Sequence, residues 1–181
     1  MGLGQTMISA AFFSLVMLSV ISVNRMMIES AVLSYETQAF DEAVMLAQDL
    51  LIETRTKRFD EKVSVSTTNV WSALSFTTED KLGPDGGAER DGIRPFPDLK
   101  PFKSTATTFY DDFDDYDGYQ RRVASIQLTD SFTVWSNVFY TTFSNTESNS
   151  SGRTFFKRID VYVSHSRYLK DTLRFSRVMT F

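Results

Sequence analysis

The sequence predicts an α+β fold, in which a long N-terminal helix, apolar at first and then amphipathic, packs on a C-terminal antiparallel β-sheet. Residues 1–24 contain no charged side chain. Neither glycine nor proline, the strongest helix breakers, occurs between Gly4 and Gly83. From about residue 119 onward, apolar and polar residues alternate with a period of two, which is typical of strands. A helix that lays its apolar stripe on a sheet gives a two-layer arrangement.

The composition excludes several classes of function. The chain has 181 residues, no cysteine, one histidine and a net charge of −4. Disulfides, thiolate metal sites and cysteine nucleophiles are therefore excluded, as is a metal site built from several histidines of one chain. The negative charge argues against a nucleic-acid partner. We find no nucleophile–base set, phosphate-binding loop or metal-ligand spacing, so we expect a protein without catalytic activity and without a resident cofactor.

Residues 7–23 are the most apolar part of the chain. They form a run of seventeen uncharged residues, at the short end of the range for a membrane-spanning helix, and would extend over roughly 25 Å as a helix. A cleaved secretory signal would have basic residues before the run, and none is present. A buried core helix is a second alternative. We favour a retained helix that contacts lipid or neighbouring subunits through Met7, Ile8, Phe12, Phe13, Leu15, Val16, Leu18, Val20 and Ile21.

The helix is expected to continue to about residue 57 as an amphipathic helix. Its apolar residues recur mostly at spacings of three and four, which indicates one stripe that packs against the chain's own sheet. The stripe consists of Ile28, Val32, Leu33, Ala39, Phe40, Ala43, Val44, Ala47, Leu50 and Leu51. The chain thus divides into an apolar helix (1–24), its amphipathic continuation (25–58), a loop-rich connection with an acidic segment (59–118) and a sheet (119–181).

Turn residues predict the structure of the connection, and period-two alternation predicts the strands of the sheet. Short β segments or an extended crossing are expected at 63–66 and 70–78, and a long loop at 79–103, which holds all four prolines. Four strands are expected at 120–128, 132–143, 153–164 and 171–181, joined by short polar links as an antiparallel meander. Residues 79–117 hold eleven acids against five bases, and residues 151–181 two acids against seven bases. These regions could pair within one subunit or between subunits.

An acidic cluster precedes the sheet, with five carboxylates in seven residues: Asp111, Asp112, Asp114, Asp115 and Asp117. Such a cluster needs neutralisation, and Ca²⁺ takes carboxylate oxygens in flexible loops. The spacing does not fit an EF-hand. The alternative is a solvated acidic turn that caps backbone amides or pairs with Arg121 and Arg122. His165, just after a predicted strand, is expected to be a surface polar residue.

Four segments in their order along the chain resemble type IV pilin-like proteins, and more narrowly the branch near the mannose-sensitive haemagglutinin minor pilins and type II secretion pseudopilins. The first is the apolar helix that runs into an amphipathic one. The others are the helix end AQDLLIE (47–53) with FDE (59–61), the acidic segment FDDYDGY (113–119), and the pair KRIDVYV (157–163) and DTLRFSRVMT (171–180). Two family features are missing: the glutamate near the start of the mature helix and a proline near the end of its apolar part.

The resemblance implies a lollipop-shaped structural subunit, with the helix embedded and the sheet outward, that assembles with identical or related subunits into a filament, pseudopilus or related cell-envelope assembly. It also implies a single-pass inner-membrane protein with an extracytoplasmic C-terminal domain, or a subunit of an extracellular filament. A single-pass accessory subunit of another membrane complex is the alternative. A membrane-anchored binding module for calcium or a surface ligand is a third hypothesis.

Overall fold

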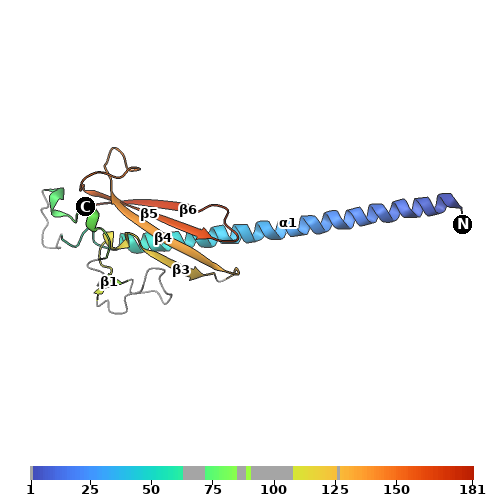
Figure 1. Ribbon diagram of the computed structural model, residues 1–181, viewed down its shortest axis with the longest axis horizontal. Helices are drawn as coiled ribbons and strands as arrows, with labels where there is room; N and C mark the ends of the chain where they lie inside the picture. Colours follow the sequence, from blue (N-terminus) through green and yellow to red (C-terminus); the bar gives the residue numbers. More distant parts are fainter. Residues whose placement is uncertain (1, 63–71, 85–88, 91–107, 126) are drawn as a thin grey trace. The chain divides into compact units, whose positions relative to one another are not determined.

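The computed structural model describes residues 2–62, 72–84, 89–90, 108–125 and 127–181. It confirms the α+β class, with one long helix near the N-terminus and a four-stranded antiparallel sheet near the C-terminus (Figure 1). The chain forms two compact units, Met1–Gln38 and Ala39–Phe181. Parts of the predicted connection, at 63–71, 85–88 and 91–107, lie outside the described residues, and with them the strand expected at 63–66.

Helix α1 extends from Leu3 to Arg55 and confirms the predicted long helix. The absence of glycine and proline between Gly4 and Gly83 allows an unbroken helix of 53 residues. In the first unit, residues 2–35 are all exposed. Within this unit, none of residues 7–23 is buried.

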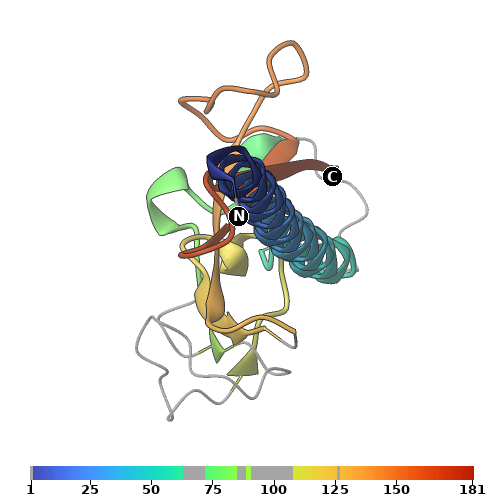
Figure 2. The ribbon, with the colours of Figure 1, turned by 90° about the vertical axis from the view of Figure 1, so that its right-hand side faces the viewer.

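The C-terminal part of α1 belongs to the second unit and packs on the sheet (Figure 1; Figure 2). Its buried face repeats at intervals of three and four residues and consists of Ala39, Ala43, Ala47, Leu50 and Thr54. Three alanines in this row let the helix backbone approach the sheet closely. Phe40, which the sequence placed in the buried stripe, is 47% exposed because the alanines on the adjacent face make the contact instead.

Four strands form the sheet in the order β3-β4-β5-β6: β3 Gln120–Ala124, β4 Ser131–Tyr140, β5 Phe156–His165 and β6 Leu173–Thr180. Every neighbouring pair is antiparallel, so the predicted meander is confirmed. A separate pair of two-residue strands, β1 Glu89–Arg90 and β2 Thr108–Phe109, is parallel.

In the described part of the chain between α1 and β3 there are three short 3₁₀ helices: η1 Ala73–Ser75, η2 Glu79–Lys81 and η4 Asp114–Tyr116. The prediction of a β segment over 70–78 is wrong for its described part. The Ser72 side chain accepts a hydrogen bond from the Leu74 amide, and this cap favours a helical turn at η1.

The register of β4 and β5 decides which side chains face α1. Tyr140 pairs with Lys157, Val138 with Ile159 and Val134 with Val163. Because side chains alternate across a strand, the odd-numbered residues of β5 from 157 to 165 all lie on the buried face. Most of this face is apolar, but its first and last members are Lys157 and His165.

Candidate functional site

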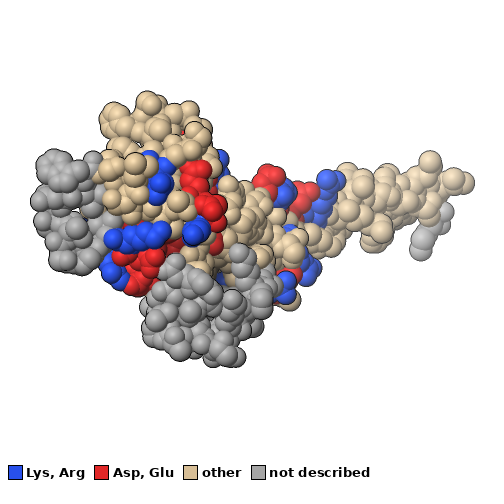
Figure 3. Space-filling model, turned by 60° about the vertical axis from the view of Figure 1, so that its left-hand side comes forward, with Lys and Arg blue, Asp and Glu red and all other residues tan. Residues whose placement is uncertain are grey.

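Apolar side chains cover the exposed surface of the first helical unit. The nine residues predicted to contact lipid or other subunits are between 44% and 73% exposed: Met7, Ile8, Phe12, Phe13, Leu15, Val16, Leu18, Val20 and Ile21. Figure 3 shows this end of the helix without basic or acidic atoms, which begin further along the chain. A continuous apolar surface of this kind is unfavourable in water and marks a site of contact with lipid or protein.

Two of the four serine hydroxyls in the apolar run, those of Ser14 and Ser19, donate to the helix backbone. Ser14 donates to the Ala10 carbonyl at 2.9 Å, and Ser19 donates to the Leu15 carbonyl at 3.0 Å. The first charged residues, Arg25 and Glu29, form an exposed ion pair at 2.8 Å. The helix is long and apolar enough to cross a membrane, a test that a signal sequence also passes. The serines are thus compatible with a low-dielectric environment.

The acidic cluster is largely buried, and its carboxylates accept hydrogen bonds from backbone amides. Asp112 accepts from the amides of Glu61 (2.7 Å) and Asp114 (2.9 Å). Asp115 accepts from the amides of Asp111 (2.8 Å) and Asp112 (3.0 Å). These contacts fix the turn at η4 and bind it to the chain that follows α1.

Two of the three remaining carboxylates, Asp117 and Asp111, connect this turn to the sheet and to the segment that follows α1. Asp117 accepts a hydrogen bond from the Val138 amide of β4 at 2.8 Å. Asp111, the one member of the cluster that is exposed, forms an ion pair with Arg58. The capping role predicted as the alternative to calcium is therefore present, but the turn is buried rather than solvated.

Lys157 lies at the centre of the buried charges. Its ammonium is fully buried and contacts Asp60 Oδ2 at 2.9 Å and Asp114 Oδ1 at 2.5 Å. It also donates to the Phe59 carbonyl at 2.8 Å and lies 4.8 Å from the centre of the Phe59 ring. The predicted pairing of the acidic and basic regions thus occurs within one chain for Lys157 and Asp114.

Asp60 is held by further donors around Lys157. Its Oδ2 accepts from the Thr77 amide at 2.8 Å, and its Oδ1 accepts from the Lys62 amide at 3.1 Å and the Thr77 hydroxyl at 3.2 Å. The Tyr140 hydroxyl donates to the Thr77 carbonyl at 2.7 Å and closes the site from the β4 side. Asp60 is 1% exposed and Tyr140 is fully buried, so the cluster is shielded from water.

Burial also decides the protonation of this cluster. It raises the pKa of Asp112 to about 7, with a further contribution from the charge of Asp114 and an opposing one from Lys157. Burial likewise raises the pKa of Asp114, while Lys157 opposes the shift. Burial and the charges of Asp60 and Asp114 raise the pKa of the Tyr140 phenol, which stays protonated. Burial thus favours the protonated forms of Asp112 and Asp114, while the charge of Lys157 favours their ionised forms.

The calcium hypothesis is not tested by these contacts. Among the described residues, no group of three or more carboxylates or histidines converges to hold a metal ion. The oxygens of Asp112, Asp114 and Asp115 face amides or the Lys157 ammonium instead. Calcium binding at Asp111, Asp112, Asp114, Asp115 and Asp117 thus stays the alternative to backbone capping, and a melting measurement with calcium, described in the Discussion, distinguishes the two.

His165 is not a surface residue, contrary to the prediction. It is 2% exposed, with its ring centre 4.7 Å from that of Phe132 and 5.3 Å from that of Tyr168. Its Nδ1 accepts from the amides of Arg167 and Tyr168, both at 3.2 Å, which places a proton on Nε2 in the neutral ring. Strand parity is the reason: position 165 lies on the same face of β5 as the other odd-numbered positions, 157, 159, 161 and 163.

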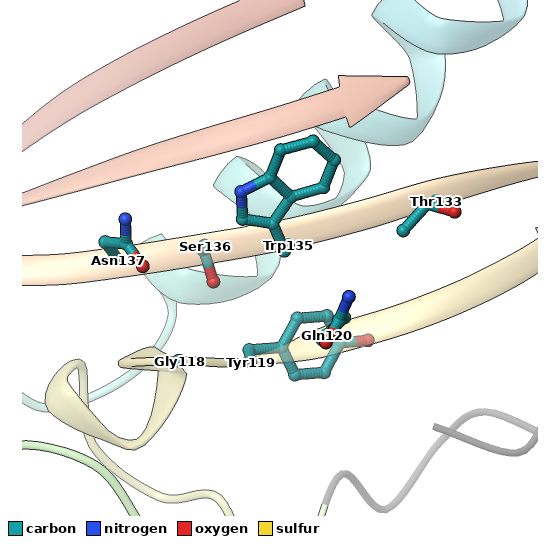
Figure 4. A pocket seen from close by; sticks show the side chains of 7 residues that line it. All are labelled: Gly118, Tyr119, Gln120, Thr133, Trp135, Ser136 and Asn137. Atoms are coloured by element: carbon teal, nitrogen blue, oxygen red, sulfur yellow. The ribbon is translucent and has the colours of Figure 1, made fainter. Parts of the chain in front are cut away.

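A shallow pocket of about 310 Å³ is lined by residues of β3, β4 and the chain before β3 (Figure 4). Its lining consists of Gly118, Tyr119, Gln120, Thr133, Trp135, Ser136 and Asn137. Trp135 stacks on Tyr162 of β5, with ring centres 5.5 Å apart. None of the described residues that line it is a carboxylate, a lysine or a histidine.

Sequence reasoning missed Asp60 and Lys157 as partners. The excess of bases in the last strands was a signal for some pairing, but it did not single out Lys157. Comparisons of the chain with protein-family models, with curated proteins and with solved structures found no match.

Proposed function

We propose that this chain is a non-catalytic structural subunit of pilin-like design, which assembles through its N-terminal helix into a filament, a pseudopilus or a related cell-envelope assembly. One observation carries the proposal: every residue from 7 to 23 is exposed, and none carries a charge. Burying each large apolar side chain is worth roughly 1.5–3 kcal/mol, so nine such residues strongly favour a covered state.

The C-terminal unit supports the same function because it has the properties of a stable head rather than of an enzyme. Its sheet packs on the end of α1 through a core that includes Phe113, Tyr116 and Phe132. Its most buried polar groups bind one another or backbone amides, which makes them structural. The resemblance of four sequence segments to minor pilins and pseudopilins is the reason why we propose a pilin-like subunit.

In this proposal the partners are identical or related subunits and the membrane, and nucleic acid is not a partner. The helix spans the inner membrane before assembly, with the sheet on the extracytoplasmic side, or lies in the core of an extracellular filament. A single-pass accessory subunit of another membrane complex is a second candidate, favoured by the length of residues 7–23, which matches a membrane span.

A pair of matched variants tests the proposal. Phe12 in the apolar helix and Phe143 in the β4–β5 connection are both exposed aromatic residues, at 65% and 83%. Phe12→Asp places a charge in the covered surface and should abolish co-purification of differently tagged copies from membranes. Phe143→Asp introduces the same charge on the head and should leave co-purification unchanged.

Co-purification that survives Phe12→Asp would overturn the assembly role of this helix. A different result would favour the accessory-subunit hypothesis over the filament hypothesis. In that case wild-type copies never co-purify with one another, and Phe12→Asp abolishes co-purification of a different membrane protein.

A further inference from the structure

The buried cluster around Lys157 has the arrangement of reactants for an intramolecular condensation. The amine of Lys157 contacts the carboxyl groups of Asp60 and Asp114. The side chains of Lys157, Asp60 and Asp114 are 0%, 0% and 4% exposed. The three groups come from distant segments: Asp60 follows α1, Asp114 begins η4 and Lys157 is in β5. A bond among them would join the end of the helix to the middle of the sheet.

We propose that Lys157 and Asp60 form a covalent isopeptide bond, with Asp114 as the group that carries protons between them. The proposal is independent of what covers the apolar helix, because all three residues belong to the unit Ala39–Phe181.

The geometry brings the reacting atoms together. Lys157 Nζ lies 2.9 Å from Asp60 Oδ2, and the carbon to be attacked is one bond beyond that oxygen. A nucleophile held next to its electrophile reacts as though at very high concentration. The Phe59 carbonyl, at 2.8 Å from Nζ, and the Phe59 ring restrict the position of the lysine side chain.

The contact between Lys157 and Asp114 provides a path for proton transfer. Lys157 Nζ contacts Asp114 Oδ1 at 2.5 Å, the shortest of its contacts, so a proton can pass from the ammonium to this carboxylate. That transfer replaces two buried charges with two neutral groups, which burial favours. Desolvated lysines are nucleophiles for this reason. Burial, which raises the pKa of Asp114, acts in the same direction.

Asp60 is surrounded by donors that would stabilise the intermediate. Amide and hydroxyl hydrogens of Thr77 and the amide of Lys62 contact its two oxygens at 2.8 to 3.2 Å. Fixed donors of this kind stabilise the negative charge that develops on a carboxyl oxygen when a nucleophile attacks its carbon.

The step balances without an oxidant or a co-reactant. The amine lone pair forms a bond to Asp60 Cγ, and one bond from Cγ to oxygen breaks. Two of the three ammonium protons pass through Asp114 to the departing oxygen, which leaves as water. The positive charge of Lys157 and the negative charge of Asp60 disappear together, Asp114 returns to its initial state, and the amide keeps one hydrogen. Exclusion of bulk water, with Tyr140 fully buried beside the site, opposes the reverse hydrolysis.

Mass spectrometry of the purified, denatured full-length chain tests this directly. The linked protein is lighter than its sequence by one water molecule. Trypsin should then release the fragment 59–62 joined to the fragment 154–158, in which cleavage after Lys157 is blocked. A chain at the full sequence mass, or a link from Lys157 to the fragment 104–121 that contains Asp114, would overturn the proposal.

Two variants separate the roles. Lys157→Arg keeps a positive charge but cannot condense, so it should have its full sequence mass. Asp114→Asn keeps both reactants but removes the proton carrier, and its linked fraction should fall at least tenfold at a fixed time after synthesis. A fully linked Asp114→Asn chain would refute the role assigned to Asp114.

Discussion

Replacing Lys157 by methionine removes a positive charge that is fully buried between two carboxylates. Methionine has a similar length and no charge, so the variant fills the space but leaves Asp60 and Asp114 without their ammonium partner. Both carboxylates would remain in the interior, where they are 1% and 3% exposed.

The expected loss of stability follows from this burial. Removing one partner of a buried ion pair costs about 3–5 kcal/mol, since the remaining charge stays desolvated. For a chain of this size, 1 kcal/mol shifts the melting temperature by roughly 2–4 °C, so the expected decrease is roughly 6–20 °C. The loss of a Lys157–Asp60 bond would add to it.

Thermal unfolding of the full chain in detergent, followed by near-ultraviolet circular dichroism, measures this decrease. The matched control is Arg174→Met, because Arg174 is 44% exposed and its partner Asp160 keeps Arg158 at 2.8 Å. An exposed pair contributes at most about 1 kcal/mol. Because burial raises the pKa of Asp114, acidification should protonate this carboxyl group in Lys157→Met, and the difference should shrink. Melting temperatures of the two variants within ~2 °C of each other at pH 7 would refute the reasoning.

Three further predictions concern the same unit. Burial raises the pKa of Asp112 to about 7, above its unfolded value, so the folded state holds a proton that the unfolded state loses. Urea titrations should therefore show a free energy of unfolding that falls by about 1.4 kcal/mol per pH unit between about pH 4 and pH 7. Asp112→Asn should remove this slope, and a flat profile of the wild type would contradict the prediction. Ala47→Leu adds volume to a fully buried site and should lower the free energy of unfolding by about 1–3 kcal/mol in the same titration. The control Met45→Leu, at a site 69% exposed, should change it by less than about 0.5 kcal/mol. Equal effects of the two variants would contradict the packing of α1 on the sheet. Because amides and Lys157 already occupy the acidic cluster, calcium should leave the melting temperature unchanged, and a rise that a chelator reverses would instead assign a metal site.

The elements of this fold could be predicted because their signals are local. An uninterrupted stretch without glycine or proline gave α1, and alternation gave β3 to β6 within a few residues. The acidic segment indicated backbone capping because Asp side chains bond to amides two or three residues away, as Asp112 does.

The buried charge cluster could not be predicted because it depends on long-range register. Lys157 faces the core only because it pairs with Tyr140, and Asp60 reaches it from a segment 97 residues away. Adjacent charges at Lys157, Arg158 and Asp160 obscured the alternation of β5, although they point to opposite faces of the sheet. His165 was misplaced for the same reason, since its position relative to solvent is set by strand parity and not by its serine neighbours.

The central claim is that residues 7–23 are covered by lipid or by identical helices. A photo-crosslinking amino acid at Phe12 or Phe13, two neighbouring positions that are 65% and 70% exposed, reports what contacts this surface in native membranes. The account predicts adducts between copies of this chain, together with lipid adducts from unassembled subunits. Recovery of a chain that lacks residues 1–24, or of adducts only within the same chain, would contradict it.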